Sequence, residues 1–291
     1  MRVGVGLPST IPNVSGKFVL EWAKKAEELG FSSLGTIDRI VYQNYESMIA
    51  LAAAAAVTQK IGLMTTVLVS PTRDTGLFAK QVASLDRISG GRVTLGVGVG
   101  GRRDDADATQ SSFSTRGRRL GAQLSLMRKI WAGEKFGDSV GTIGPAPAQK
   151  GGPTILIGGR VPRAVSRIGK WGDGYIGSGM DSKTASSTFK IAQDSWAKHN
   201  RDGKPKLVCC FYYALGDSPE RGADYLRHYY AFAGQFAENI AKGMLSSGPQ
   251  MKDVADSFSA IDANEIIMWP CIADINQLNL LAESLSSYLR S

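Results

Sequence analysis

The segment RVTLGVGVGG, residues 92–101, is an apolar run that ends in glycines. A second apolar run covers residues 61–69, and apolar side chains recur at helical spacing over residues 78–88 between the two runs. This pattern predicts a strand, a helix and a second strand, with bare backbone at the carboxyl end of the second strand. Because glycine has no Cβ, a phosphate or a flat ring can approach the main-chain N–H groups there. The segment therefore favours a protein that binds a cofactor.

Strand and helix patterns alternate along the whole chain. The predicted strands cover residues 3–7, 33–37, 61–69, 92–98, 154–157, 174–176, 206–215 and 265–269. A helical pattern follows each strand, whereas residues 133–153 are rich in glycine and proline and are expected to lack regular structure. Eight apolar strands, each followed by a helix, predict an α/β fold: a TIM (β/α)8 barrel, as a single domain over residues 1–291. An open doubly wound sheet is the structural alternative.

The glycines at the end of residues 92–101 also match the dinucleotide fingerprint G-x-G-x-x-G, through Gly96, Gly98 and Gly101. That fingerprint requires a helix directly after it and a strand ending in Asp or Glu about 20 residues further on. Residues 102–105 continue as a polar stretch, and no such strand follows. We therefore disfavour a Rossmann domain.

Composition sets the broad class of the protein. The 291 residues are 43% hydrophobic and 21% charged, as in an ordinary globular protein, and no apolar run approaches the roughly 20 residues that span a bilayer. The amino terminus has no signal-peptide pattern, so we expect a cytoplasmic protein that does not interact with membranes. Cys209, Cys210 and Cys271 lack metal-type spacing and are expected to be small buried hydrophobes, with the two adjacent cysteines on opposite faces of a strand.

The net charge of +8 points to an anionic partner. Positive residues are scattered except for Arg102–Arg103 and the run RGRR at residues 116–119. The sequence has no basic helix interleaved with aromatic residues and no nucleic-acid-binding motif. An anionic cofactor or substrate therefore explains the charge better than a nucleic acid does.

In a barrel of this kind the active site is formed by the loops that follow the carboxyl ends of the strands. These ends carry the following residues: Pro8, Thr10, Asp38, Arg39, 66–70, 98–105, 158–160, 177–180, Tyr212, Tyr213, Trp269 and Cys271. Both histidines, His199 and His228, fall instead in helix patterns, and no cluster of metal-ligating residues is evident, so no metal is expected. A site with many glycines and no histidine suggests that a cofactor carries the chemistry. Gly158, Gly159 and Arg160, just before a helix expected to begin at Pro162, are suited to a phosphate monoester.

Several motifs together resemble the luciferase-like monooxygenases, a family of flavin- or deazaflavin-dependent oxidoreductases. They are AEELGF at residues 26–31, IGLMTTVLVSP at 61–71, AKQVASLDRISGGR at 79–92, GGPTILIGG at 151–159 and WGDGY at 171–175. The resemblance runs nearly from end to end. It implies a TIM barrel that binds FMN or the deazaflavin F-420 at the carboxyl ends of the strands.

The resemblance also implies positions for the cofactor. The ring would rest against Thr66 and Val67, where several family members have a non-proline cis peptide. Gly98, Val99 and Gly100 would lie along the ribityl chain. The phosphate would be held by Gly158, Gly159, Arg160 and Ser178.

Two positions depart from the family pattern. Many F-420-dependent members carry Asp-His after the second strand, where this chain has Asp38–Arg39. The sugar-phosphate dehydrogenases of the family carry a carboxylate just after the glycine run, where this chain has Gly101. Both departures argue against a glucose-6-phosphate dehydrogenase and favour FMN.

The preferred hypothesis is a monooxygenase that uses reduced FMN, supplied by a separate flavin reductase, and O2 on a small organic substrate. Arg39, Asp38 and Ser70 are the candidate catalytic residues: Arg39, Ser70 and Thr66 would donate hydrogen bonds to an anionic oxygen intermediate, while Arg39 has a structural salt bridge to Asp38 as its alternative role. Phe78 is a candidate, like Tyr212 and Trp269, for lining an apolar substrate pocket.

Two other hypotheses remain open. The first is F-420-dependent hydride transfer, in which Arg102, Arg103 and the net positive charge would serve the anionic cofactor tail. The second is a non-catalytic flavin-binding barrel, suggested by the missing histidine and carboxylate. By analogy with the family we expect a homodimer formed through the helices that follow strands two and three.

Overall fold

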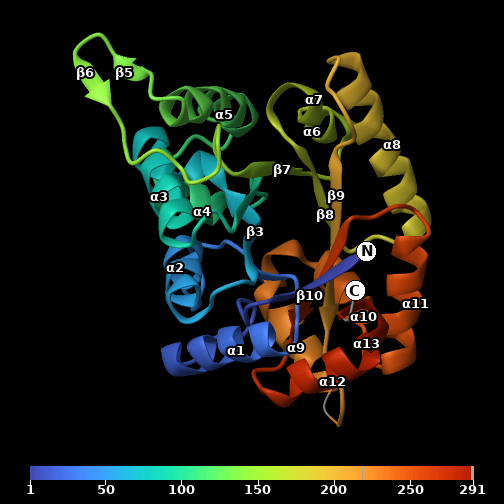
Figure 1. Ribbon diagram of the computed structural model, residues 1–291. Helices are drawn as coiled ribbons and strands as arrows, with labels where there is room; N and C mark the ends of the chain where they lie inside the picture. The colour runs from blue at the N-terminus through green and yellow to red at the C-terminus, as the bar shows by residue number, and fades with distance from the viewer. Residues whose placement is uncertain (218, 290–291) are drawn as a thin grey trace.

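Eight parallel strands close into a barrel in the computed structural model, which describes residues 1–217 and 219–289 (Figure 1). The barrel strands are β1 (Arg2–Gly6), β2 (Ser33–Thr36), β3 (Gly62–Val69), β4 (Val93–Gly98), β7 (Thr154–Gly158), β8 (Gly174–Ser178), β9 (Lys206–Tyr213) and β10 (Glu265–Pro270). Neighbouring strands follow chain order, and β10 pairs with β1 to close the ring. The predicted TIM barrel is therefore confirmed, and the open-sheet alternative is wrong. The predicted domain, residues 1–291, includes residues 218 and 290–291, which lie outside this description.

Helices surround the barrel. They are α1 (Gly16–Glu28), α2 (Ser47–Val57), α3 (Thr75–Ile88), α4 (Arg103–Ala108), α5 (Arg116–Trp131), α6 (Pro162–Val165), α7 (Ile168–Trp171), α8 (Ser182–Lys198), α9 (Pro219–Tyr229), α10 (Gln235–Lys242), α11 (Gly248–Ser259), α12 (Asn276–Ser284) and α13 (Ser286–Leu289), with the 3-10 turns η1 (Ser70–Thr72) and η2 (Ala231–Ala233).

Local sequence explains where these helices begin and which face they bury. Ser15 caps α1 by accepting the Phe18 N–H, and Asp74 and Asp181 cap α3 and α8 in the same way. On α1 the apolar positions fall on one face, and the indole N–H of Trp22 donates to the carbonyl of Gly6 at 3.0 Å. This bond fixes α1 against the carboxyl end of β1.

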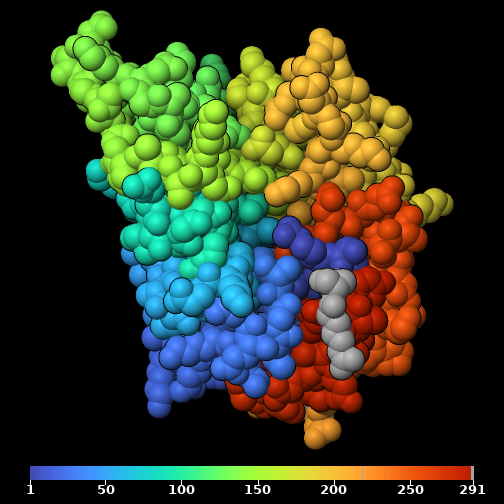
Figure 2. Space-filling view, in the orientation of Figure 1, coloured from blue at the N-terminus to red at the C-terminus, as the bar shows by residue number. Residues whose placement is uncertain are grey.

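Two expectations about the connections were wrong. Residues 133–153 include a short antiparallel hairpin, β5 (Lys135–Gly137) with β6 (Val140–Thr142), which projects from the upper left of the molecule in Figure 2. In addition, α4 begins at Arg103, two residues after the glycine run, although residues 102–105 had been expected to continue as a polar stretch. Because Asp104 and Asp105 favour the first turn of a helix, a polar stretch can open one. The Rossmann alternative fails because the sheet closes into a barrel.

The cysteines are buried as predicted. Cys209 packs in the layer between barrel and helices, and Cys210 packs inside the barrel with Met64 and Ile267. All three thiols are free, and burial raises the pKa of Cys209 to about 12. They are therefore unreactive packing groups at neutral pH.

Gly96 on β4 illustrates how closely the strands pack. A Cβ at this position would lie 2.1 Å from the carbonyl oxygen of Thr65, which belongs to the neighbouring strand β3. We expect Gly96→Ala to lower the free energy of unfolding by about 1–3 kcal/mol, because the backbone must move to admit the methyl group. Urea unfolding measures this effect. Gly101→Ala is the matched control, since no atom lies within 4 Å of its added Cβ, and an equal loss in both variants would contradict the packing argument.

Candidate active site

The carboxyl end of β3 has the irregular backbone that the family resemblance implied. The peptide bond between Thr66 and Val67 is cis, and the pairing of β3 with β4 shifts register between Thr65 and Leu68. The hydroxyl of Thr66 donates to the carbonyl of Thr36 at 3.0 Å and accepts the indole N–H of Trp269 at 3.1 Å. Both bonds are buried, so this point of β3 is held by its neighbour β2 and by β10, which is not adjacent to β3 in the sheet.

The glycines of β4 and β7 make room for the side chain of Val67. A Cβ on Gly98 would lie 3.0 Å from one methyl of Val67, and a Cβ on Gly158 would lie 2.9 Å from the other. Gly100 has a positive φ of 71°, and a Cβ there would meet Val69 at 2.6 Å. Glycine is therefore required at these positions by the close packing of β3, whether or not a ligand binds there.

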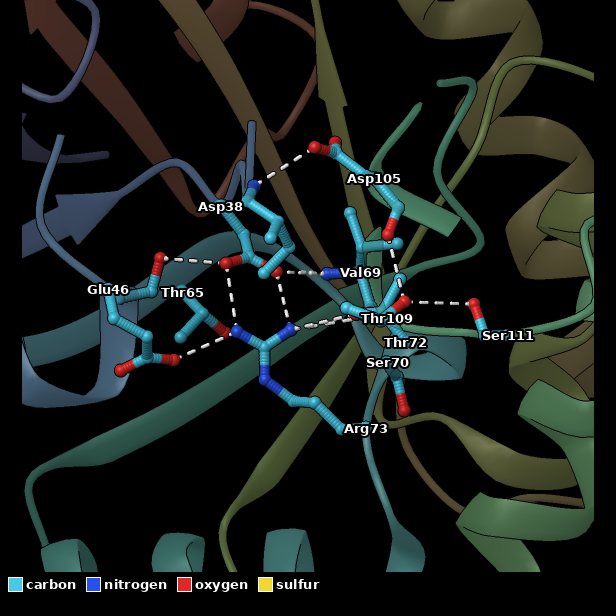
Figure 3. A network of polar contacts seen from close by, with 12 residues as sticks. Asp38, Glu46, Thr65, Val69, Ser70, Thr72, Arg73, Asp105, Thr109 and Ser111 are labelled. Atoms are coloured by element: carbon cyan, nitrogen blue, oxygen red, sulfur yellow. Dashed lines mark hydrogen bonds and ion pairs between the residues drawn. The ribbon is translucent and has the colours of Figure 1, made fainter. Parts of the chain in front are cut away.

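Asp38 lies at the centre of a buried ionic network rather than beside Arg39 (Figure 3). Its two carboxylate oxygens accept hydrogen bonds from the two terminal nitrogens of Arg73 at 2.7 and 2.9 Å, and one of them also accepts the backbone N–H of Val69 at 2.8 Å. Arg73 also reaches Glu46 at 2.8 Å. Burial opposes the charge on Arg73, but Asp38 and Glu46 outweigh it, so the pKa of Arg73 is raised. The predicted Arg39–Asp38 salt bridge is therefore wrong.

Arg39 lies instead among aromatic rings. Its guanidinium donates to the carbonyl of Tyr229 at 2.5 Å, and its central carbon lies 4.4 Å from the ring centre of Tyr42 and 4.8 Å from that of Tyr229. Burial lowers the pKa of Arg39, and the charge of Arg102 lowers it further. Arg102 is itself paired with Asp104, and it lies 4.2 Å from the ring centre of Phe232, which Arg39 also approaches.

Ser70 is fully buried in η1, where its hydroxyl donates to the side-chain oxygen of Gln123 at 3.0 Å. In Figure 3 this hydroxyl points away from the Asp38–Arg73 pair. Phe78, proposed as a pocket residue, is buried in the core between α3 and the barrel, so that expectation is wrong. Tyr212 and Trp269 do lie together, with ring centres 4.8 Å apart.

The residues predicted to contact the cofactor tail divide between two hollows. Arg160 and Ser178 line a cavity of about 320 Å³, which also has Tyr212 and Tyr230 in its wall. Val99 instead lines a groove of about 1,070 Å³. The helix expected to begin at Pro162 is α6, which has only four residues, so its dipole adds little to phosphate binding.

The groove is strongly basic. It lies between α5 and the α6–α7 segment, which are neighbours in Figure 1. Its charged lining residues are Arg116, Arg118, Arg163, Arg167 and Lys170. No carboxylate is among the described residues that line it. Burial and the charge of Arg163 lower the pKa of Arg167, as expected where like charges face one another.

This groove fits the anionic tail that FMN and F-420 share. A cationic, acid-free hollow beside Val99, one residue beyond β4, is what the phosphate of either cofactor requires. The carboxyl end of β3 lies next to β4, so a ring at Thr66–Val67 and a tail in the groove are on neighbouring strands.

Comparison with known proteins identifies the family. The model of the luciferase-like monooxygenase family matches residues 1–265. The chain belongs to the luciferase-like monooxygenase family. An uncharacterised protein of Mycobacterium tuberculosis is 31% identical over 185 residues, which are 60% of this chain and 64% of that protein, so the match spans less than two thirds of the relative's length. An F420-dependent glucose-6-phosphate dehydrogenase of Nocardia farcinica is 29% identical over 61% of this chain and 58% of its own.

Among solved structures, monooxygenase RslO1 from Streptomyces bottropensis superposes with a TM-score of 0.82, with 20% identity and 99% of each chain covered. At this identity the likeness shows the fold. Members of the luciferase-like family are oxidoreductases that use flavin or F-420, and one relative of this chain is an F420-dependent enzyme.

The sequence did not predict that basic residues from two separate segments form one groove. The RGRR run was visible as a local concentration of charge, but its partners Arg163, Arg167 and Lys170 lie about 45 residues later, in a segment that reads as an ordinary short helix. Among the described residues, no three acidic, histidine or cysteine side chains gather as metal ligands would. None of the helices described in the chain has the length and apolarity needed to cross a membrane.

Proposed function

We propose that this chain is an F-420-dependent oxidoreductase that exchanges a hydride with a small organic substrate. The observation that carries the proposal is the basic groove, whose volume of about 1,070 Å³ and five cationic residues exceed what a single phosphate needs. An extended, multiply charged tail would use more of it. The similarity to an F420-dependent relative supports the same choice.

The residues at the barrel mouth would position the ring. Trp269 and Thr36 hold the Thr66 hydroxyl, and Val67 fills the space between Gly98 and Gly158, so the surface behind the ring would be rigid. The bound deazaflavin would supply the hydride. The hydroxyls of Tyr212 and Tyr230 lie 2.6 Å apart in the cavity wall, and burial raises the pKa of both, so they stay protonated. One of them donates to the other, and the second O–H can donate to a substrate oxygen.

Most of the donors expected for oxygen chemistry are committed elsewhere, although the Nε of Arg39 is buried and has no hydrogen-bond partner among the described residues. Ser70 donates to Gln123, Thr66 donates to Thr36, and Arg39 donates to Tyr229 and lies against aromatic rings. This arrangement argues against the FMN and O2 hypothesis. One feature still favours it: position 39 holds an arginine, whose guanidinium stays protonated and cannot act as an acid–base group. FMN with a separate reductase is therefore kept as the second candidate.

Titration calorimetry with oxidised and reduced F-420, and in parallel with FMN, tests the proposal. We expect F-420 to bind more tightly than FMN, and the difference to shrink as NaCl is raised because salt screens the groove charges. Tighter binding of FMN would overturn the cofactor assignment. Binding of neither would overturn the enzymatic function.

Association of two copies through α2 and α3 is also proposed. Ile49 on α2 and Leu77 and Ile88 on α3 are 65%, 58% and 69% exposed. Large apolar side chains on adjacent helices that face solvent are typical of a surface that a partner covers.

A further inference from the structure

The 320 Å³ cavity has an apolar wall with a single cation at its edge. Its apolar lining comes from the loop after β8, from β9 and from the α10–α11 region, and includes Met180, Phe211, Ile240, Leu245 and Val254. Arg160, two residues after β7, lies at the rim with its central carbon 4.8 Å from the ring centre of Phe236. The cavity is thus enclosed mainly by hydrocarbon and aromatic groups.

The charge of Arg160 is left without a carboxylate. Within the part of the chain that the structure describes, its guanidinium contacts the carbonyl oxygen of Ser178, at 3.4 Å, and the Phe236 ring. The one acid in the cavity lining, Asp181, accepts the Thr184 N–H at 2.7 Å as the cap of α8, and backbone bonding from Thr184 lowers its pKa. Among the described residues, no ion pair therefore competes for Arg160.

The cavity is close to the expected position of the cofactor ring. Tyr212 is part of the cavity wall, and its ring centre lies 4.8 Å from that of Trp269. The indole of Trp269 in turn donates to Thr66 at 3.1 Å. Only the side chains of Tyr212 and Trp269 therefore separate a molecule in the cavity from Thr66 on β3 along this chain of contacts.

We propose that this cavity binds the substrate, and that the substrate is an amphipathic acid: an apolar body in the cavity and a carboxylate on Arg160. The assignment of the ligand as the substrate rests on the proposed function. The volume of about 320 Å³ has room for on the order of ten non-hydrogen atoms at about 30 Å³ each. A guanidinium recognises a carboxylate through paired N–H donors, which gives the ligand one orientation in the cavity.

The test is titration calorimetry of the chain without cofactor, using octanoate, 1-octanol and octylamine as probes of equal chain length. Octanoate is expected to bind most tightly. Arg160→Gln is expected to weaken octanoate about tenfold and leave 1-octanol unchanged. Arg87→Gln, an exposed arginine on α3, is the control and should change neither. Val254→Trp should reduce the binding of all probes, since it fills the cavity.

The proposal is overturned if octanoate binds Arg160→Gln as tightly as the wild type, if octylamine or 1-octanol binds better than octanoate, or if no octyl compound binds. None of these outcomes affects the result of the cofactor titration, because the probes are tested without cofactor. Failure of this proposal can therefore be told apart from failure of the proposed function. The opposite result is also informative. If the chain bound neither F-420 nor FMN but still bound octanoate in a manner that depends on Arg160, the proposed function would be wrong and the acid-binding cavity would still be supported.

Discussion

Asp38→Asn is expected to lower the free energy of unfolding by about 3–5 kcal/mol, because it leaves the buried guanidinium of Arg73 without its main counter-charge. The side chains of Arg73 and Asp38 are only 11% and 1% exposed, so water cannot replace the lost carboxylate. The backbone N–H of Val69 would also lose a charged acceptor. Urea unfolding followed by circular dichroism measures the change.

Glu46→Gln is the control for this effect. Glu46 contacts the same guanidinium, but its side chain is 40% exposed, and we expect a loss within about 1 kcal/mol. If Asp38→Asn unfolded at the same urea concentration as the wild type but lost turnover, the candidate catalytic role of Asp38 would be favoured over the structural one that the geometry supports.

Replacing both Arg163 and Arg167 by glutamine is expected to weaken F-420 binding about 100-fold, which corresponds to roughly 1–2 kcal/mol for each charge-assisted contact. Arg167 extends across the groove, since a Cβ on Gly117 of α5 would lie 2.8 Å from its guanidinium. Calorimetric titration of the double variant measures the loss. The residual affinity should also depend less on NaCl.

Arg87→Gln serves as the matched control, because it removes an exposed arginine from α3 outside the groove. Unchanged F-420 affinity in the double variant, with the fold retained by circular dichroism, would show that the cofactor tail lies elsewhere. The aromatic-lined cavity around Arg160 would then be the next candidate for the tail.

Local sequence rules predicted most of the elements well. The run 61–69 became β3 (Gly62–Val69), and 92–98 became β4 (Val93–Gly98). These predictions succeeded because apolar periodicity and caps act over a few residues. The β5–β6 hairpin was missed because its strands have three residues each and all six residues are exposed, so no burial pattern marks them.

The candidate site was predicted less completely. The family resemblance implied the cis bond at Thr66–Val67, which the structure has, whereas the cofactor contacts of Gly98 and Gly158 stay a prediction. It did not reveal that Asp38 pairs with Arg73, since these residues are 35 positions apart and both lie in loops. Nor could it assign Arg160 to the cavity and Val99 to the groove, because each hollow is lined by residues that are far apart in the sequence.

The sequence by itself determined the eight-fold alternation of strand and helix, the family, and a net positive charge suited to an anionic partner. The alternation and the family motifs depend on residue types at short spacing, and the net charge is a sum over the whole chain. Only the tertiary structure decided which charges are neutralised: Arg73 is committed to Asp38, whereas among the described residues no carboxylate lines the groove and Arg160 forms no ion pair. The physical reason is that Coulomb and hydrogen-bond energies depend on distance and burial in space, which the closure of the barrel sets and which sequence separation does not.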